Sequence, residues 1–384
     1  MTRSAQNSDT PPSSGLDRDV AAAMVLPVYG GDAHEATPGQ ANANRSIYGV
    51  ATAAEVISKY RPAGLLLVDR IPFHDGFAEV ELGMLSSTER LRCFVESVQE
   101  VARAEQMMPL LIVADQEGGE GSRLPTPALP SPAEIGQTQD SAIGAHAGVL
   151  TGRAARAHGV GIVLGPLGDL GLGNAAIGGR AFSSDPAVVA TLATSWVRGL
   201  QTQGVSGVVK HWPGHGRANA DSHVRTPVLN VDADTWSREE LLPFEAAINA
   251  DVAGVLVAHL TAPLLDPSGA LASQSPVLVE KLRDELSFAG FTMSDALWMP
   301  SARSSAANDA EVAVATLRAG IDLLLAPPDP SGTSALTQKA PELEETAKSS
   351  LDRIARLRSR QPQVDWTVDI DELSAEILEF NANL

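Results

Sequence analysis

The fold is indicated by residues 205–216, which read VSGVVKHWPGHG. In this stretch a short apolar run, residues 205–209, ends abruptly in charged residues and a turn rich in glycine and proline. Seven further apolar runs of strand length occur along the chain, at residues 24–29, 64–68, 109–114, 161–165, 254–258, 291–293 and 322–326. They do not alternate between apolar and polar residues. Such continuous apolar runs are typical of strands buried on both faces of a parallel sheet. The sequence therefore predicts eight parallel strands.

Segments with helical periodicity separate these runs, at residues 85–106, 141–158, 237–250, 275–286 and 307–319. A further helix should begin at Pro186, with Asp185 as its N-cap. Alternating strands and helices indicate βαβ units, and eight such units favour a closed (β/α)8 barrel of the TIM type. A doubly wound sheet is the alternative. However, residues 29–32 after the first run read YGGD, which is no dinucleotide fingerprint, and the chain has no GxxxxGK[ST] phosphate loop.

We expect the 384 residues to divide into a tail at residues 1–19, the barrel at residues 20–330 and a helical C-terminal extension at residues 331–384. The tail is polar and lacks the apolar middle region of a secretory signal, so we expect it to be disordered and the protein to be cytoplasmic. In the extension we expect one helix over residues 335–358. An amphipathic helix over residues 369–380 should pack on the outside of the barrel.

Charge and composition exclude several classes of partner. The 47 acidic residues outnumber the 28 Lys and Arg residues and give a net charge of −19, which repels phosphate backbones and anionic membrane surfaces. The chain contains no apolar run of about 18 residues that could span a bilayer. Its single cysteine, Cys93, cannot form an internal disulfide, and we expect it to be a small buried apolar residue. Neither nucleic acid nor a membrane is expected as a partner, and the oligomeric state stays open.

Titratable residues gather directly after the apolar runs, where ligands bind in a barrel of this type. In chain order they are Asp115, Glu117, Arg123, Asp169, Arg180, Lys210, His211, His215, Asp221, His223, His259 and Asp295. The exception is Asp322, which lies inside the eighth run. We therefore predict that these side chains form a site at the C-terminal end of the barrel.

Several of these residues also have an ordinary structural interpretation. Asp295 could serve as a helix N-cap, Glu117 could cap a neighbouring backbone, and His259 could be a hydrogen-bonded wall of a pocket. A Ser-His-Asp acyl-transfer site is not indicated, because the chain has no GxSxG turn.

A metal site is the main rival interpretation for His211, His215, Asp221 and His223. Pro213 and the glycines beside His215 prevent the helical spacing that two such histidines would need, so we expect no metal.

Taken together, these motifs resemble glycoside hydrolase family 3, in particular its β-N-acetylglucosaminidase branch. The resemblance covers roughly residues 20–330 and rests on four segments in the family's order. They are DQEGG at residues 115–119 with Arg123, IGGRAF at residues 177–182, KHWPGHG at residues 210–216 with DSH at residues 221–223, and SDAL at residues 294–297. The resemblance implies a (β/α)8 barrel that needs no cofactor. It also implies a retaining exo-β-N-acetylglucosaminidase that releases terminal GlcNAc from cell-wall muropeptides or chito-oligosaccharides.

The resemblance further implies a role for each site residue. Asp295 would be the nucleophile that forms a glycosyl-enzyme, and His223 would be the general acid/base, paired with Asp221 on a mobile loop that His215 helps to shape. An imidazole suits this role because its pKa of about 6.5 allows it to donate and accept protons near neutrality. The sugar hydroxyls would be held by Asp115, Arg123, Arg180, Lys210 and His211.

The chain departs from the family pattern at several positions. Glu120 stands where an arginine often follows the two glycines, and Arg217 stands where an aspartate is common. These departures leave the aglycone open. The alternatives to a hydrolase of GlcNAc are a GlcNAc phosphorylase, a β-glucosidase of the same family, and a catalytically silent sugar-binding protein.

Overall fold

A computed structural model describes residues 22–68, 83–303, 308–361 and 365–384. Its eight strands form one parallel sheet in the order β7-β6-β5-β4-β3-β2-β1-β8. They are β1 (Met24–Pro27), β2 (Gly64–Leu66), β3 (Leu111–Asp115), β4 (Ile162–Leu164), β5 (Ser206–Trp212), β6 (Gly254–Val257), β7 (Phe291–Ser294) and β8 (Leu324–Leu325). A parallel bridge between Met293 and Leu323 links the two ends of this order. The predicted (β/α)8 barrel is therefore confirmed.

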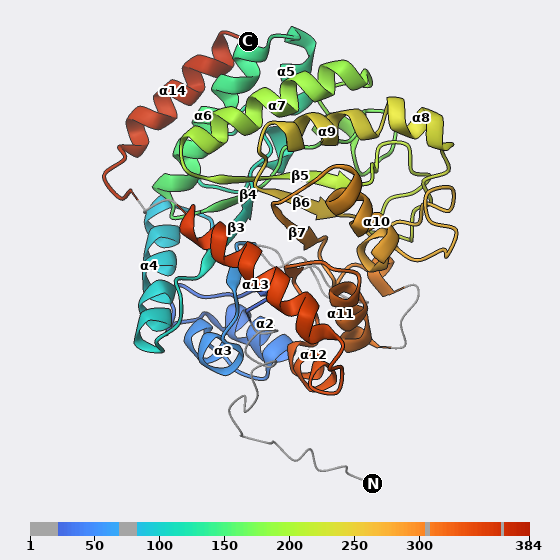
Figure 1. Cartoon of the computed structure of the whole chain (residues 1–384). Helices are drawn as coiled ribbons and strands as arrows, with labels where there is room; N and C mark the ends of the chain where they lie inside the picture. Colours follow the sequence, from blue (N-terminus) through green and yellow to red (C-terminus); the bar gives the residue numbers. More distant parts are fainter. Residues whose placement is uncertain (1–21, 69–82, 304–307, 362–364) are drawn as a thin grey trace.

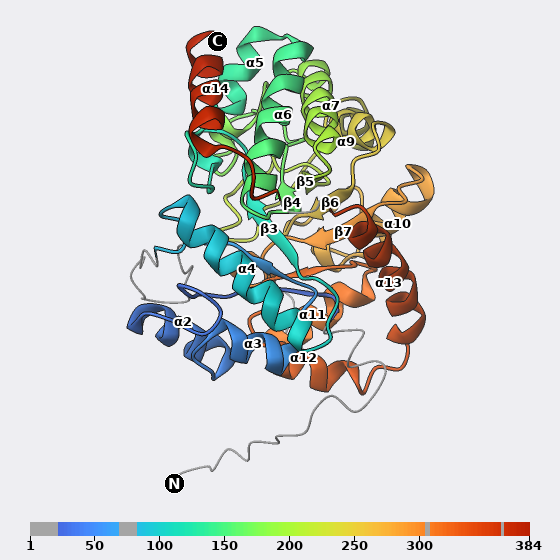
Figure 2. The ribbon, with the colours of Figure 1, turned by 90° about the vertical axis from the view of Figure 1, so that its left-hand side faces the viewer.

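Helices surround the strands on all sides seen in Figures 1 and 2. They are α2 (Pro38–Tyr48), α3 (Ala53–Tyr60), α4 (Thr88–Ala104), α5 (Pro132–Thr138), α6 (Ser141–Ala157), α7 (Pro186–Thr202), α8 (Ala233–Arg238), α9 (Leu241–Asn249), α10 (Pro276–Glu280), α11 (Asp309–Arg318), α12 (Pro330–Thr337), α13 (Leu343–Ser359) and α14 (Ile370–Ala382). The predicted start of α7 is confirmed, because the Asp185 side chain accepts the N–H of Ala187 at 2.8 Å.

The strands are buried on both faces, as their continuous apolar sequences predict. In β1, Met24 and Leu26 belong to the core between strands and helices, whereas Val25 belongs to a second cluster. In β3, Ile112 joins the first core and Val113 joins the second. Successive side chains of a strand point to opposite faces, so each strand contributes to both cores.

Two predictions are wrong. The helix expected over residues 335–358 is two helices, α12 and α13, and Pro341 lies in the break between them, where it cannot donate a helical hydrogen bond. Cys93 is exposed on α4, whereas Leu91 and Phe94 on the same helix are buried.

A buried carboxylate stabilises the N-terminal end of the barrel. The fully buried Asp322, which precedes β8, accepts hydrogen bonds from Arg283 at 2.8 Å, from Arg353 at 2.9 Å and from the Ser350 hydroxyl at 2.7 Å. Because Ser350 and Arg353 lie on α13, this carboxylate ties α13 to the barrel. This contact explains why an acidic residue occupies the eighth apolar run.

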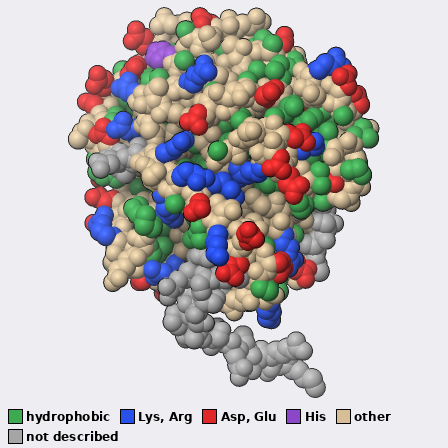
Figure 3. Space-filling view, viewed as in Figure 1, with side chains coloured by type: hydrophobic (Ala, Val, Ile, Leu, Met, Phe, Trp, Pro, Cys, Tyr) green, Lys and Arg blue, Asp and Glu red, His purple; other side chains and the backbone are tan. Residues whose placement is uncertain are grey.

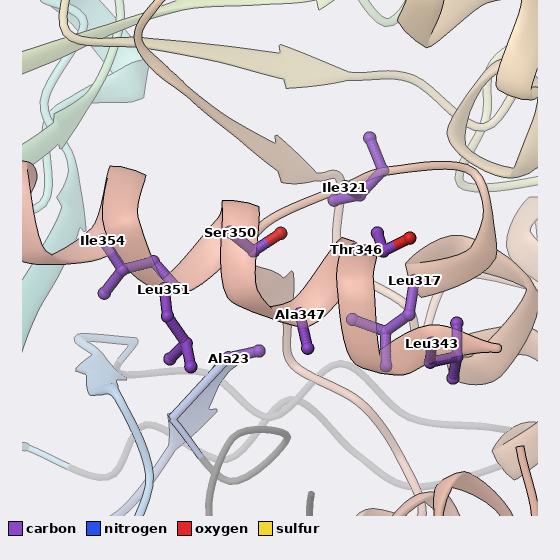
Figure 4. A pocket seen from close by; sticks show the side chains of 9 residues that line it. All are labelled: Ala23, Leu317, Ile321, Leu343, Thr346, Ala347, Ser350, Leu351 and Ile354. Atoms are coloured by element: carbon purple, nitrogen blue, oxygen red, sulfur yellow. The ribbon is translucent and has the colours of Figure 1, made fainter. Parts of the chain in front are cut away.

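A small pocket beneath α13 lies at the same end and is almost entirely aliphatic (Figure 4). Only Thr346 and Ser350 among its lining residues carry a polar side-chain atom, so the lining contains no titratable acid or base. On the outer surface of this face, Lys and Arg side chains gather across the middle in spite of the negative net charge (Figure 3).

The predicted tail at residues 1–19 lies outside the described residues, and the division at residues 19 and 330 stays a prediction. The amphipathic helix expected over residues 369–380 is α14, and its Leu373 and Ile377 are buried in the main core. Figure 2 shows α14 lying along α6. Within the described residues, no helix combines the length and the apolar character that a membrane span requires.

Candidate active site at the C-terminal end of the barrel

Four charged side chains from neighbouring strand ends form an ion-pair cluster. Lys210 on β5 places its Nζ 2.8 Å from Oδ1 of Asp115, at the end of β3, and 2.5 Å from Oε1 of Glu117. Arg180, in the short turn Gly178–Arg180 after β4, donates to both carboxylate oxygens of Glu117 at 2.7 Å each. Lys210 and Glu117 are buried, so Glu117 connects the two cations in a place with little water.

The electrostatics keep this cluster charged. Burial alone would raise the pKa of Glu117, but Lys210 and Arg180 hold it far below its ordinary value. Burial alone would lower the pKa of Lys210, but Asp115 and Glu117 more than offset this, so that the pKa is raised. Both groups are therefore ionised near neutral pH, and the head groups can form charged hydrogen bonds to sugar hydroxyls.

A second buried carboxylate, Asp169, fixes the turn that follows β5. Its Oδ2 lies 2.5 Å from Nδ1 of His211, and its Oδ1 accepts the backbone N–H of His215 at 2.6 Å. Because a carboxylate only accepts, Nδ1 of His211 carries the proton in this contact. The ring of His211 is thus oriented, with Nε2 as the nitrogen left for a ligand.

Asp295 directly follows β7 and is half-buried. Its Oδ1 accepts the N–H of Ala296 at 2.8 Å. Burial would raise the pKa of Asp295, but the imidazoles of His211 and His259 and the Ala296 N–H outweigh this effect and lower it. Lys210, a member of the ion-pair cluster, adds to the lowering. The residue is therefore an ionised carboxylate, as a nucleophile must be.

The histidine of the DSH segment forms a pair with its aspartate on an exposed loop. Nδ1 of His223 lies 2.8 Å from Oδ1 of Asp221, which also accepts the backbone N–H of His223 at 2.8 Å. The side chain of His223 is 65% exposed and that of Asp221 is 29% exposed. Burial would raise the pKa of Asp221, but its hydrogen bonds with His223 hold it below its ordinary value. Asp221 thus orients the ring, and Nε2 is the nitrogen available for proton transfer.

The other predicted residues have different surroundings. Arg123 is exposed, and its guanidinium donates to the backbone carbonyl of Glu120 at 2.7 Å and to that of Ser122. It thus lies against its own loop. His259 is buried, with Nδ1 2.7 Å from the Ser273 hydroxyl and Nε2 3.2 Å from the Ala296 carbonyl oxygen, so it is a hydrogen-bonded wall behind Asp295.

Two organising residues were not assigned a role from the sequence. For Glu117 the sequence offers the role of a backbone cap, whereas the structure pairs its carboxylate with Lys210 and Arg180. The sequence places Asp169 among the titratable residues of the site but gives it no role. The signal for both was their position after a strand, and Glu117 also lies two residues from Asp115. Among the residues that the structure describes, no three His, Cys, Asp or Glu side chains form a set that could hold a metal ion.

Comparisons with known proteins agree with this geometry. The family model described as "Glycosyl hydrolase family 3 N terminal domain" matches residues 47–359. A curated β-hexosaminidase from Stenotrophomonas maltophilia (strain K279a) is 36% identical over 261 residues, which cover 66% of this chain and 76% of that protein.

Solved structures give the same result. A family 3 β-N-acetylglucosaminidase from Paenibacillus sp. str. FPU-7 superposes with a TM-score of 0.80 at 26% identity, over 96% of this chain and 69% of that one. A family 3 glycosyl hydrolase from Mycobacterium smegmatis gives a TM-score of 0.71 at 25% identity, over 92% and 99% of the two chains. The chain therefore belongs to glycosyl hydrolase family 3 and is a glycoside hydrolase.

Proposed function

We propose that the protein is a retaining exo-β-N-acetylglucosaminidase that removes terminal β-linked GlcNAc from cell-wall muropeptides or chito-oligosaccharides. The proposal is supported above all by the half-buried carboxylate of Asp295 at the end of β7, whose pKa is lowered by His211, His259 and Lys210, together with the Asp221–His223 pair on the loop after β5. The names of the β-hexosaminidase and β-N-acetylglucosaminidase relatives support GlcNAc as the sugar.

In the first step, a carboxylate oxygen of Asp295 attacks the anomeric carbon. The bond from that carbon to the leaving oxygen breaks, and His223 as the imidazolium donates its Nε2 proton to this oxygen. Asp221 stabilises the imidazolium, as a carboxylate does behind a catalytic histidine in hydrolytic triads. The product of the step is a glycosyl ester on Asp295 and a free aglycone.

In the second step, neutral His223 accepts a proton from water, and the resulting hydroxide oxygen attacks the anomeric carbon. The ester bond to Asp295 breaks and the carboxylate is regenerated, so that two inversions give net retention. The sugar is held during both steps by Asp115, Arg180, Lys210 and His211. Each charged hydrogen bond to a hydroxyl contributes about 1.5–3 kcal/mol.

The proposal is tested by turnover of an aryl β-GlcNAc beside the matching aryl β-glucoside. We expect GlcNAc to be released far faster than glucose. Asp295→Asn should abolish detectable turnover. The control Asp352→Asn, which changes an exposed aspartate on α13, should leave turnover intact. Faster release of glucose would identify a β-glucosidase, and GlcNAc-1-phosphate formed in phosphate buffer would identify a phosphorylase. Binding without turnover would identify a sugar-binding protein.

The role of His223 is tested by the choice of leaving group. An activated aryl group needs little protonation, so His223→Ala should reduce kcat/KM for it far less than for a natural GlcNAc disaccharide. Equal losses on the two substrates would contradict an acid role for His223.

A further inference from the structure

His215 is a buried imidazole without a hydrogen-bond partner. The residue is 1% exposed, and neither ring nitrogen bonds to another described residue. A buried polar group left unsatisfied costs about 1–3 kcal/mol, so such a group in a functional region calls for an explanation. Shaping the loop through its backbone does not require an imidazole at this position.

The backbone around His215 is held firmly while its ring is not. Asp169 accepts the His215 N–H at 2.6 Å. The next residue, Gly216, lies so close to Leu170 that an added Cβ would come within 1.9 Å of the Leu170 carbonyl oxygen. The ring packs edge-on against that of His211, with 5.8 Å between the ring centres. Packing alone therefore orients a donor that has no acceptor in this structure.

Three carboxylates are close enough to interact electrostatically with the His215 ring: Asp169, Asp295 and Asp221. The oxygens of Asp169 already accept from His211 and from the His215 backbone. Asp295 faces the sugar site in the proposed reaction. In Asp221, by contrast, both bonds from His223 go to Oδ1. Its Oδ2 is therefore the most suitable acceptor for a ring N–H of His215.

We propose that His215 is a positioning residue, which donates a ring N–H to Oδ2 of Asp221 when the loop of residues 217–225 lies over a bound sugar. This inference rests on the proposed function, because it assigns the Asp221–His223 pair to proton transfer. The contact fixes the carboxylate in one orientation, and the carboxylate fixes the His223 ring at the leaving oxygen. No proton passes through His215; it holds the pair, as outer hydrogen-bond partners hold the histidine ligands of metal sites.

The experiment compares four proteins, namely wild type, His215→Phe, His223→Ala and the double variant, on a GlcNAc disaccharide and on an activated aryl β-GlcNAc. Phenylalanine keeps the ring shape and removes both nitrogens. We expect H215F to lower kcat/KM on the disaccharide about 10–100-fold, the range seen for second-layer partners of metal sites, and to have little effect on the aryl substrate. The double variant should be no slower than H223A, and His215→Gln, which retains a donor, should recover part of the loss.

Equal losses of H215F on both substrates, or a further loss in the double variant, would overturn the inference, because His215 would then act on the sugar or on the fold. If H215F does not fold, His215→Met, which is also apolar and flexible enough to fill the space, carries the same comparison. The proposed function fails separately: wild type would then not release GlcNAc, or H223A would show no dependence on the leaving group.

Discussion

Two carboxylates, Glu117 and Asp169, organise the groups that carry the chemistry. Glu117 spaces the cations of Lys210 and Arg180, and Asp169 orients His211 and the turn at His215. Neither needs to touch the sugar for this effect. Removal of one partner of a buried ion pair leaves the other charge uncompensated, which is more costly than the loss of the attraction itself.

Glu117→Gln tests this organisation. The change keeps the size of the side chain and removes its charge, so two cations remain beside Asp115 alone. We expect the free energy of unfolding in a urea titration to fall by about 3–5 kcal/mol, the range for breaking buried pairs, and KM to rise because the head groups shift. Glu120→Gln, at an exposed neighbouring position, is the control and should change neither quantity. Unchanged stability of E117Q would show that Glu117 is not an electrostatic centre.

The sequence predicts the site residues at this scale better than it predicts their contacts. Asp115, Lys210 and Asp295 are recognisable because each follows an apolar strand, and the barrel topology brings strand ends together. The pairing of Glu117 with Arg180 joins residues 63 positions apart. Such a pairing depends on which strands are neighbours in the barrel. The position of a residue after its own strand does not reveal that order.

At the scale of elements, the loop after β5 is anchored at its base. The guanidinium of Arg217 contacts the carboxylates of Glu239 and Glu240, at the junction of α8 and α9. Glu240 is buried, with 1% of its side chain exposed. This contact explains how an arginine is accommodated where the family pattern leads one to expect an aspartate, since the chain supplies two acidic partners.

Arg217→Ala should free this loop. The variant leaves Glu240 buried and unpaired, so we expect a lower Tm and faster amide hydrogen exchange across residues 217–225. Activity on a GlcNAc disaccharide should fall because His223 lies on the same loop. Arg225→Ala removes a cation from the same loop, whose guanidinium donates to the backbone carbonyl of Asn219 at 3.2 Å, and it should have a much smaller effect. Equal exchange rates in wild type and R217A would contradict the anchoring.

Strands were easier to predict than helices. Each of the eight apolar runs overlaps a strand, because burial on both faces leaves an unbroken apolar signal. Helices α2, α3 and α5 were not predicted, since their apolar faces are short. Each nevertheless begins with a capping box, formed by Thr37 with Gln40, Thr52 with Glu55, and Ser131 with Glu134. This local pattern was the available signal for them.

In the whole molecule, contacts that stabilise the fold and groups of the candidate active site lie at opposite ends of the barrel. The Asp322 contacts and the aliphatic pocket beneath α13 lie at the N-terminal end, and the ionised groups of the site lie at the other. This division is the one expected of a barrel whose catalytic groups follow its strands.

A buried histidine between α4 and α6 makes the stability of the whole fold depend on pH. Nδ1 of His158 lies 2.8 Å from the Ala154 carbonyl oxygen and Nε2 lies 3.0 Å from the Thr88 hydroxyl, a pattern that suits the neutral ring. Burial lowers the pKa of His158 to about 4. The unfolded chain, with a histidine pKa of about 6.5, therefore binds a proton that the folded chain does not.

As the pH falls from about 6.5 towards about 4, protonation of His158 in the unfolded chain lowers the free energy of the unfolded state relative to the folded state. We expect this group alone to remove up to about 3 kcal/mol of the free energy of unfolding. His158→Gln cannot titrate, so its unfolding free energy, measured by urea at pH 7.5 and pH 5, should decline less than that of wild type. His34→Gln, at an exposed position, should decline as wild type does. Parallel declines in wild type and H158Q would contradict the prediction.

The most direct test of the account is the identity of the residue that becomes glycosylated. A 5-fluoro derivative of GlcNAc with fluoride as leaving group slows both steps and favours the ester, which intact-protein mass spectrometry followed by peptide mapping can locate. We predict a mass increase of one sugar residue, carried by Asp295. A label on another carboxylate, or fluoride release by an enzyme that never carries the label, would contradict the assignment of Asp295 as the nucleophile.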